Sequence, residues 1–228
     1  MNTKALQKLL LVLLLSSTLY GVQSIKVNKT TSYSTNVLSK KMSVQEKKQR
    51  FRDLVVPAVN RVYADLEAKY RVAKRKIDSG KIDAQIEHLM KFYSAKNPQD
   101  LLVRMKPHAK SVAIAQAAME SAWATSRFTR VANNLFGVHS IKTDEARVKA
   151  NSASNVYVTK YENIEEAIRD YYKILATGKI FGEFRTEKMR SNDPYKLVKK
   201  LDKYSEKGAE YGKELASMIR YNRFYMFD

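Results

Sequence analysis

The stretch "VAIAQAAMESAWATSRFTRVANNLFGV" (residues 112–138) decides the fold of this chain. From Val112 to Met119 the only polar side chain is Gln116, so the segment predicts a helix that is buried on nearly all sides. Glu120 follows directly, although an unpaired carboxylate in a core is unfavourable. We therefore expect Glu120 to be a buried carboxyl group with a special role. The run "NNLFG" then predicts a tight turn, because Asn and Gly tolerate left-handed backbone.

The residues before this stretch predict an N-terminal helical hairpin over 43–96. "SVQE" is a capping box, with Ser43 and Glu46 three residues apart. An apolar face precedes Pro57, and a second helical pattern runs from 59 to 77 until Gly80 offers a C-terminal cap. A further short amphipathic stretch completes the hairpin.

Residues 97–228 predict one mainly α (α+β) domain with a small β-element. "NVYVTKY" (155–161) alternates as a strand does, and it is the only convincing strand pattern in the sequence. A last helix is expected over about 210–221. Capping residues mark three further helix starts: Asn97, Asn163 and Asp193.

The N-terminus has the pattern of an export signal. Lys4 and Lys8 precede an apolar run of Leu and Val, which is shorter than the roughly 20 residues of a membrane-spanning helix. We expect a signal peptide over 1–24 and an exported, periplasmic protein, with a retained N-terminal anchor as the alternative. Residues 25–42 are rich in Ser, Thr, Lys and Asn and predict a flexible linker.

The chain is strongly basic, with 42 Lys and Arg against 23 Asp and Glu and a formal net charge of +19. Such a surplus of positive charge indicates which partners the protein can bind, and it says nothing about the fold. Export argues against nucleic acid as the partner and leaves an anionic cell-wall or membrane surface. The cluster "KYRVAKRK" (69–76) is either an attachment face for such a surface or an ordinary solvated helix face.

The motifs that are missing narrow the chemistry. The sequence has no Cys, no Gly-rich phosphate loop, no HExxH and no GxSxG. Its three histidines, His88, His108 and His139, lie far apart in the sequence, so no metal site and no cofactor are expected. Asp and Glu side chains therefore remain as the candidates for catalysis. A buried carboxyl group has a raised pKa and can serve as a general acid, as in glycosidases. Local sequence alone equally allows Glu120 to form a salt bridge to Arg127 or Arg130.

The motif "AQAAMESAWATSRFTRVANNLFGV" resembles the signature of Bax-type bacterial glucosaminidases, a group within the peptidoglycan N-acetylglucosaminidases. Further similar segments are "YENIEEAIRDYYKIL", "YSEKGAEYGKELASMIR" and, near the N-terminus, "KKQRFRDLVVPAV". The resemblance covers about residues 45–228 and implies a lysozyme-like fold over 97–228. It also implies an exported hydrolase that cleaves the β-1,4 bond between N-acetylglucosamine and N-acetylmuramic acid.

The resemblance also suggests which residues form the site. Glu120 would be the general acid, Glu145, with Asp144 beside it, the second carboxylate, and Tyr204 a catalytic residue lining the cleft. For Glu145 the alternative is a solvated loop acid, and for Tyr204 a core aromatic. The expected substrate contacts are Trp123, Asn134, Phe136, Gly137 and Tyr157.

The sequence departs from the family pattern at two positions. Ala122 and Ala124 stand where the family commonly has Gly. Alanine favours helix, so we expect the helix to persist there and activity to survive.

Two other functions remain open at this point. A lytic transglycosylase would use a lone Glu on the same fold, and a non-catalytic wall-binding module would bind glycan strands without turnover. The expected partner is peptidoglycan, bound by a monomer.

Overall fold

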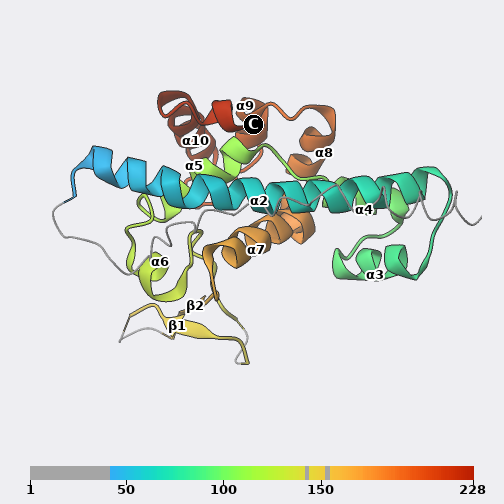
Figure 1. Cartoon of the computed structure of the whole chain (residues 1–228), viewed down its shortest axis with the longest axis horizontal. Helices are drawn as coiled ribbons and strands as arrows, with labels where there is room; N and C mark the ends of the chain where they lie inside the picture. Colours follow the sequence, from blue (N-terminus) through green and yellow to red (C-terminus); the bar gives the residue numbers. More distant parts are fainter. Residues whose placement is uncertain (1–41, 142–143, 152–154) are drawn as a thin grey trace, which may run out of the picture. The chain divides into compact units, whose positions relative to one another are not determined.

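The computed structural model describes residues 42–141, 144–151 and 155–228 (Figure 1). The predicted signal peptide and nearly all of the predicted linker lie outside these residues. Within them, no helix is both long and apolar enough to cross a membrane. The elements are α2 (Val44–Asp78), α3 (Ala84–Phe92), α4 (Pro98–Met105), α5 (Lys110–Glu120), α6 (Arg127–Ala132), β1 (Arg147–Lys149), β2 (Tyr157–Thr159), α7 (Ile164–Thr177), η1 (Lys179–Phe181), α8 (Gly182–Arg190), α9 (Pro194–Val198), α10 (Ala209–Tyr221) and η2 (Phe224–Phe227).

Helix α2 runs without a break through Pro57, whereas the sequence predicted two helical segments that separate there. It begins at the predicted capping box, with Ser43 as N-cap and Glu46 reaching back to the Ser43 backbone. Proline disfavours a helix interior. Here the apolar stripe continues on both sides of it, and Val55 and Val59 are completely buried. Packing of this stripe therefore outweighs the local cost of Pro57.

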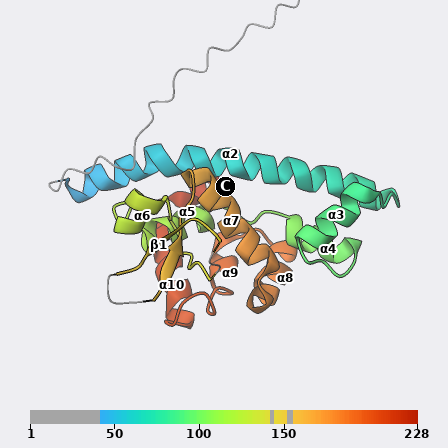
Figure 2. The same ribbon diagram turned by 90° about the horizontal axis from the view of Figure 1, so that it is seen from below.

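Helix α2 packs along α4, α5 and α7 (Figure 2). Its N-terminal half shares one core with α5, and Phe51 approaches Phe224 of η2 with 6.5 Å between ring centroids. Lys48 donates a 3.0 Å hydrogen bond to Asn222 Oδ1, and Arg52 donates one of 3.1 Å to the carbonyl of Asn222. The first described helix is thus joined to the last residues of the chain. Its C-terminal half packs instead with α3 and α4 in a second, smaller core.

Helix α5 carries Glu120 and is buried from Ser111 to Ala118. Its N-terminus lacks a capping side chain of its own. Asp228 supplies one, accepting hydrogen bonds from the backbone N–H (2.8 Å) and the hydroxyl (2.6 Å) of Ser111. A carboxylate at this end of a helix satisfies free N–H groups and opposes the helix dipole. The capped helix is a rigid support for its C-terminal residue, Glu120.

The predicted β-element is an antiparallel pair. Strand β2 lies within the predicted strand 155–161 and pairs with β1, so that Val148 faces Val158. Strand β1 was not predicted, because its three residues are only half-buried and do not show an apolar alternation. The mainly helical architecture with a small two-stranded sheet confirms the predicted fold class.

Candidate active site

Glu120 is the last residue of α5, and it is exposed rather than buried as the sequence predicted. The apolar run ends at the surface, so the carboxyl group emerges where the core helix stops. Its Oε1 accepts a 2.6 Å hydrogen bond from the hydroxyl of Tyr211 in α10. The predicted alternative, a salt bridge to Arg127 or Arg130, is not among the ion pairs of the described residues.

Tyr211 belongs to a chain of hydrogen bonds that crosses the core. The hydroxyl of Tyr171 donates to Gln116 Oε1 at 2.5 Å, and Gln116 Nε2 donates to the Tyr211 hydroxyl at 2.9 Å. Tyr211 then donates to Glu120. Gln116 and the two tyrosines are buried, so each polar group needs a partner. The network fixes the direction in which the Tyr211 hydroxyl points, and with it the position of Oε1.

The pKa of Glu120 is raised above its ordinary value. Loss of hydration around the carboxyl group raises it, while the hydrogen bond from Tyr211 and the charge of Lys207 lower it, and the first effect is larger. An exposed residue can still have a partly desolvated carboxyl group, because one of its oxygens lies against Tyr211. A raised pKa is what a carboxylic acid needs to donate a proton near neutral pH.

Tyr204 lies beside this pair. Its ring stacks on Tyr211 with centroids 5.5 Å apart and planes 9° apart, and it also approaches Phe181 at 6.1 Å. Burial, and then the nearby charge of Glu120, raise the pKa of Tyr204 well above its usual range. The structure therefore brings together the predicted residues Glu120 and Tyr204, and adds Tyr211.

The backbone after Glu120 does not continue as helix. Ala122, Trp123 and Ala124 have φ angles of 49°, 63° and 58°, in the left-handed region that favours glycine. The prediction that Ala122 and Ala124 keep the helix is wrong. Glycine at both positions would relieve the strain, which explains why the family pattern has it. Ser121 holds the turn, because its hydroxyl accepts a 2.7 Å hydrogen bond from the Ala124 N–H and donates to the Ala117 carbonyl.

Comparison with known proteins places this site in a family. Residues 95–224, more than half of the chain, match the glucosaminidase family model, described as mannosyl-glycoprotein endo-beta-N-acetylglucosaminidase. The chain belongs to the glucosaminidase family. The family predicted from the motif around Glu120 is thereby confirmed.

Two further proteins are similar to this chain. Protein bax of Escherichia coli (strain K12) is 29% identical over 133 residues, which make up 54% of this chain and 46% of that protein. The chain thus spans about half the length of the curated relative it matches. The crystal structure of the catalytic domain of the autolysin Auto from Listeria monocytogenes aligns with a TM-score of 0.43 and 21% identity, over 68% of this chain and 96% of that one.

Asn134 of the NNLFG motif ties this turn to the β-hairpin. Asn134 is buried, and its amide nitrogen donates 2.9 Å hydrogen bonds to the carbonyls of Val138 and Thr159, while its oxygen accepts one from the Val138 N–H. Phe136 stacks on Tyr171 at 4.1 Å, and Gly137 has a φ of 67°. These contacts give Asn134 and Phe136 structural partners within the protein, so a contact of either residue with substrate stays a prediction.

The β-hairpin and the bend before it carry two other predicted residues. Tyr157 in β2 is half-buried under the guanidinium of Arg147, 4.1 Å from the ring centroid. Glu145 lies in the bend before β1 and lines a large cavity between α7 and the hairpin. Glu120 does not line that cavity, so Glu145, the predicted second carboxylate, lies on a different space in this structure.

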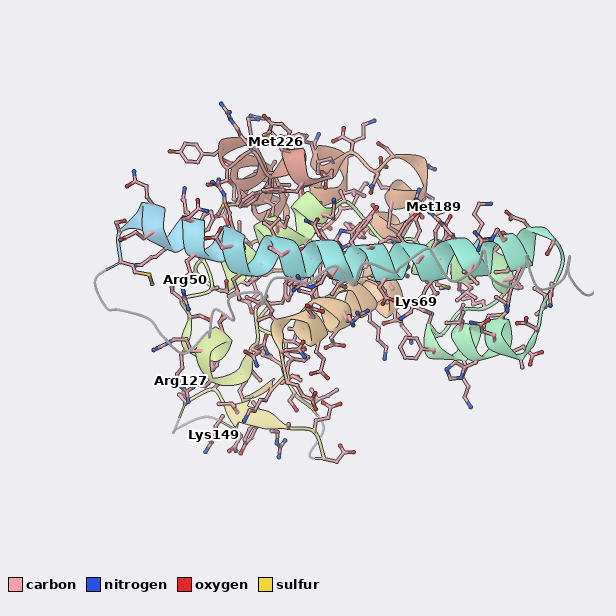
Figure 3. The ribbon with its side chains drawn as sticks, viewed as in Figure 1. Arg50, Lys69, Arg127, Lys149, Met189 and Met226 are labelled. Carbon is pink, nitrogen blue, oxygen red and sulfur yellow. The ribbon has the colours of Figure 1, made fainter. Side chains whose placement is uncertain are left out.

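Arg127, which the sequence allowed as a salt-bridge partner of Glu120, bonds to the hairpin instead. Arg127 donates 3.1 Å hydrogen bonds to the carbonyls of Lys149 and Ala150, which ties α6 to the hairpin. Figure 3 shows Arg127 and Lys149 together at this junction. Arg127 therefore holds the hairpin against α6.

Trp123, predicted to bind substrate, contacts the N-terminal helix. Its ring meets Phe51 edge to face at 5.3 Å, and the Lys48 ammonium lies 4.9 Å from its centroid. The half-buried ring also lines a small cavity of about 500 Å³ with Met119 and Tyr221. Trp123 thus packs on the core through Phe51 and also lines this cavity, of which Glu120 is not a lining residue.

Tyr211, the direct partner of Glu120, had no predicted role in the site. Tyr211 lies in the apolar stripe of α10, where its position is that of an ordinary core residue. A weak signal was present, because a buried phenol and the lone polar Gln116 each need a partner. In the part of the chain that the structure describes, no three or more His, Cys, Asp or Glu side chains form a group that could hold a metal ion.

Proposed function

We propose that this chain is an exported peptidoglycan hydrolase that cleaves the β-1,4 bond between N-acetylglucosamine and N-acetylmuramic acid, with Glu120 as the general acid. The observation that supports this most is the contact of Glu120 with Tyr211 at the end of α5. It combines a raised carboxyl pKa with a fixed side chain at the surface. Membership of the glucosaminidase family supports the same class of bond.

The contact also assigns different tasks to the two carboxyl oxygens. Oε1 accepts from Tyr211, whose own oxygen already accepts from Gln116. The proton of Glu120 is then best held on Oε2, for which the described residues supply no hydrogen-bond partner. Oε2 would protonate the glycosidic oxygen as the bond from that oxygen to the sugar breaks.

The second group of the reaction is proposed to be Glu145. A carboxylate on the hairpin would orient or activate the water that completes hydrolysis. Since Glu145 lines a cavity without Glu120, this role requires the substrate to bridge the two, or the hairpin to approach α5. The acetamido group of the substrate is the alternative partner.

The export signal and the basic charge complete the proposal. The N-terminal pattern of residues 1–24 supports action outside the cytoplasm on the wall polymer, by a monomer. The net charge of +19 favours approach to an anionic wall or membrane surface. The cluster 69–76 is a weak candidate for this contact, because four of its cations form ion pairs: Lys69–Asp65, Arg71–Glu67, Lys74–Asp78 and Lys76–Asp83.

The deciding experiment is digestion of purified sacculi with the exported form of the protein, followed by mass identification of the fragments. Fragments that end in reducing N-acetylglucosamine support the proposal. Anhydro-muramoyl ends would show a lytic transglycosylase instead. Retention on sacculi without any fragments would show a wall-binding module.

A further inference from the structure

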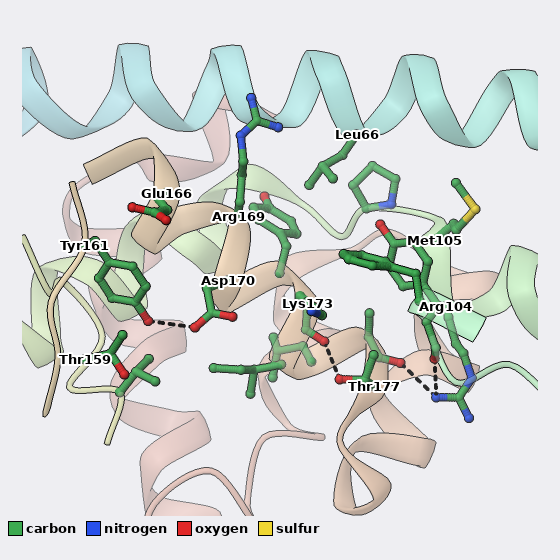
Figure 4. Close-up of a pocket in the computed structure, with 18 of the residues that line it drawn as sticks. Leu66, Arg104, Met105, Thr159, Tyr161, Glu166, Arg169, Asp170, Lys173 and Thr177 are labelled. Carbon is green, nitrogen blue, oxygen red and sulfur yellow. Dashed lines mark hydrogen bonds between the residues drawn. The ribbon is translucent and has the colours of Figure 1, made fainter. Parts of the chain in front are cut away.

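Two cavities among the described residues differ in how their charged side chains are satisfied. In the larger, of about 1220 Å³ between α7 and the β-hairpin, Figure 4 shows Asp170 accepting a 2.7 Å hydrogen bond from Tyr161. At its other end Arg104 donates to two backbone carbonyls and pairs with Asp100. The smaller cavity, of about 500 Å³, lies between α2, the end of α5 and α10. It is lined by Lys48, which forms no ion pair with any carboxylate that the structure describes.

The ammonium group of Lys48 is held in place by uncharged groups. Its Nζ donates a 3.0 Å hydrogen bond to Asn222 Oδ1 and lies 4.9 Å from the ring centroids of both Trp123 and Tyr221. The Lys48 side chain is half-buried and lines the cavity, so a ligand can reach it from that side. A fixed cation that is partly removed from water and has no counter-ion favours an anionic ligand.

The other charged group of this cavity is already neutralised. Glu214 lines it from α10, and both of its carboxyl oxygens accept hydrogen bonds from Lys207, at 2.8 and 2.7 Å. A half-exposed pair of this kind adds little stability, but its two charges cancel locally. The cavity therefore presents the positive charge of Lys48.

The rest of the lining is mostly apolar. Met119, Met218 and the half-buried ring of Trp123 supply this surface, and the exposed hydroxyl of Ser217 adds a polar group. The C–H face of a sugar ring packs on such a surface while its hydroxyl groups stay hydrated. A sugar that also carries a carboxylate fits both the apolar lining and Lys48.

N-acetylmuramic acid is such a sugar, because its lactyl group ends in a carboxylate when no stem peptide is attached. We propose that this cavity binds an N-acetylmuramic acid unit with a free lactyl carboxylate, the carboxylate on Lys48 and the sugar ring on Trp123. That the unit belongs to the strand that this chain cleaves rests on the proposed function. In intact peptidoglycan an amide bond joins the lactyl group to the stem peptide. The preferred strands are therefore products of an amidase, which adds water across that bond and frees the carboxylate.

The position of the cavity relative to Glu120 agrees with this ligand. Met119, which lines the cavity, directly precedes Glu120 in α5. Glu214 follows Tyr211, the partner of Glu120, at a spacing that makes side chains neighbours on a helix surface. A strand cleaved at Glu120 can therefore place a nearby unit in the cavity. Since Lys48 belongs to α2, outside residues 95–224 of the family match, the N-terminal helix supplies this preference.

Trp123 is the single tryptophan of the chain, so its fluorescence reports on ligands in this cavity. The test is titration of the Glu120→Gln variant, which keeps the glycan intact, with the peptide-free tetrasaccharide of alternating N-acetylglucosamine and N-acetylmuramic acid. The comparison ligand is the same tetrasaccharide with its lactyl carboxylates converted to methyl amides. We expect a change in Trp123 emission and about tenfold tighter binding of the acid than of the amide. This comparison changes only the ligand and leaves the cavity unaltered.

Introducing Lys48→Met into the same protein should abolish the preference for the acid. The matched control is Lys47→Met, which removes the same charge from the neighbouring position of α2 but does not line the cavity, and it should keep the preference. Calorimetric titration gives the affinities, and thermal unfolding checks that both variants are folded.

Equal affinity for the acid and the amide before any lysine is replaced would overturn the proposal. So would equal losses in the two lysine variants, which would show a general effect of charge. Tighter binding of a stem-bearing tetrasaccharide than of the free acid would also contradict it and assign the carboxylate to the stem peptide. Hydrolysis of peptide-free strands by the unaltered protein is measured in parallel. Hydrolysis without a preference for the acid disproves only this inference, and a preference without hydrolysis disproves only the proposed function.

Discussion

Tyr211 donates a 2.6 Å hydrogen bond to Glu120 from a position 91 residues further along the chain. This bond favours the charged carboxylate, and it partly offsets the desolvation that raises the pKa of Glu120. Tyr211 therefore positions the acid and limits how far its pKa rises. Each of these effects can be measured separately.

Replacing Tyr211 with Phe should lower turnover and shift its pH dependence. A general acid works only while it is protonated, so activity falls as pH rises through its pKa. Loss of the Tyr211 bond raises the pKa of Glu120, and the alkaline limb of kcat/KM should move to higher pH. Tyr221→Phe, which alters an exposed tyrosine of the same helix, is the control and should leave the limb in place. A limb that does not move in Tyr211→Phe would show that Glu120 is not the titrating acid.

Replacing Glu120 with Gln should preserve the fold and reduce hydrolysis by about 10²-fold or more, because the amide has no proton to donate. Release of soluble fragments from sacculi measures this, with thermal unfolding as the check on folding. Unaltered turnover in this variant would remove Glu120 from the mechanism.

Glu145→Gln should reduce turnover if this carboxylate orients or activates water. Asp144→Asn serves as the neighbouring control. If only the Asp144 variant loses activity, the second carboxylate is one position away from our assignment. If neither change matters, the substrate acetamido group becomes the better candidate.

Replacing Ala122 with Gly should stabilise the protein by about 1 kcal/mol, because a left-handed φ is costly for alanine. Ala122 is exposed, so little packing is lost. The matched control is Ala118→Gly inside α5, which should destabilise by about 1 kcal/mol. Denaturant unfolding gives both values. A loss of stability in Ala122→Gly would contradict the left-handed turn.

Lys188→Met should raise stability, and the gain should depend on pH. Burial, with Arg185 and Lys106 nearby, lowers the pKa of Lys188 to about 7. Below that pH the folded state holds a buried charge, and as pH rises toward the ordinary value of 10.5 the penalty disappears. Met should therefore raise the unfolding temperature more at pH 6 than at pH 9. An equal gain at both values would mean that Lys188 titrates normally.

The sequence predicted the elements that depend on local chemistry. The capping residues Ser43, Asn97 and Asn163 all occupy N-cap positions, and the apolar run before Glu120 is the buried helix. Prediction from the sequence failed where packing between distant parts of the chain determines the local structure. Alanine propensity favours helix at 122–124, yet the chain turns there to leave the core, and α2 continues through Pro57 because α5 and α7 bury its stripe. The bond from Tyr211 could not be predicted, since no local pattern joins residues so far apart.

The joining of α2 to the last residues of the chain affects the order in which the protein can fold. Phe51 reaches its contact with Phe224, and Lys48 its bond to Asn222, only after nearly all of the sequence has been made. Contacts between such distant positions form slowly, because a long loop must close first. The main core therefore closes late in folding, once the residues from Phe51 to Phe224 are all available to pack.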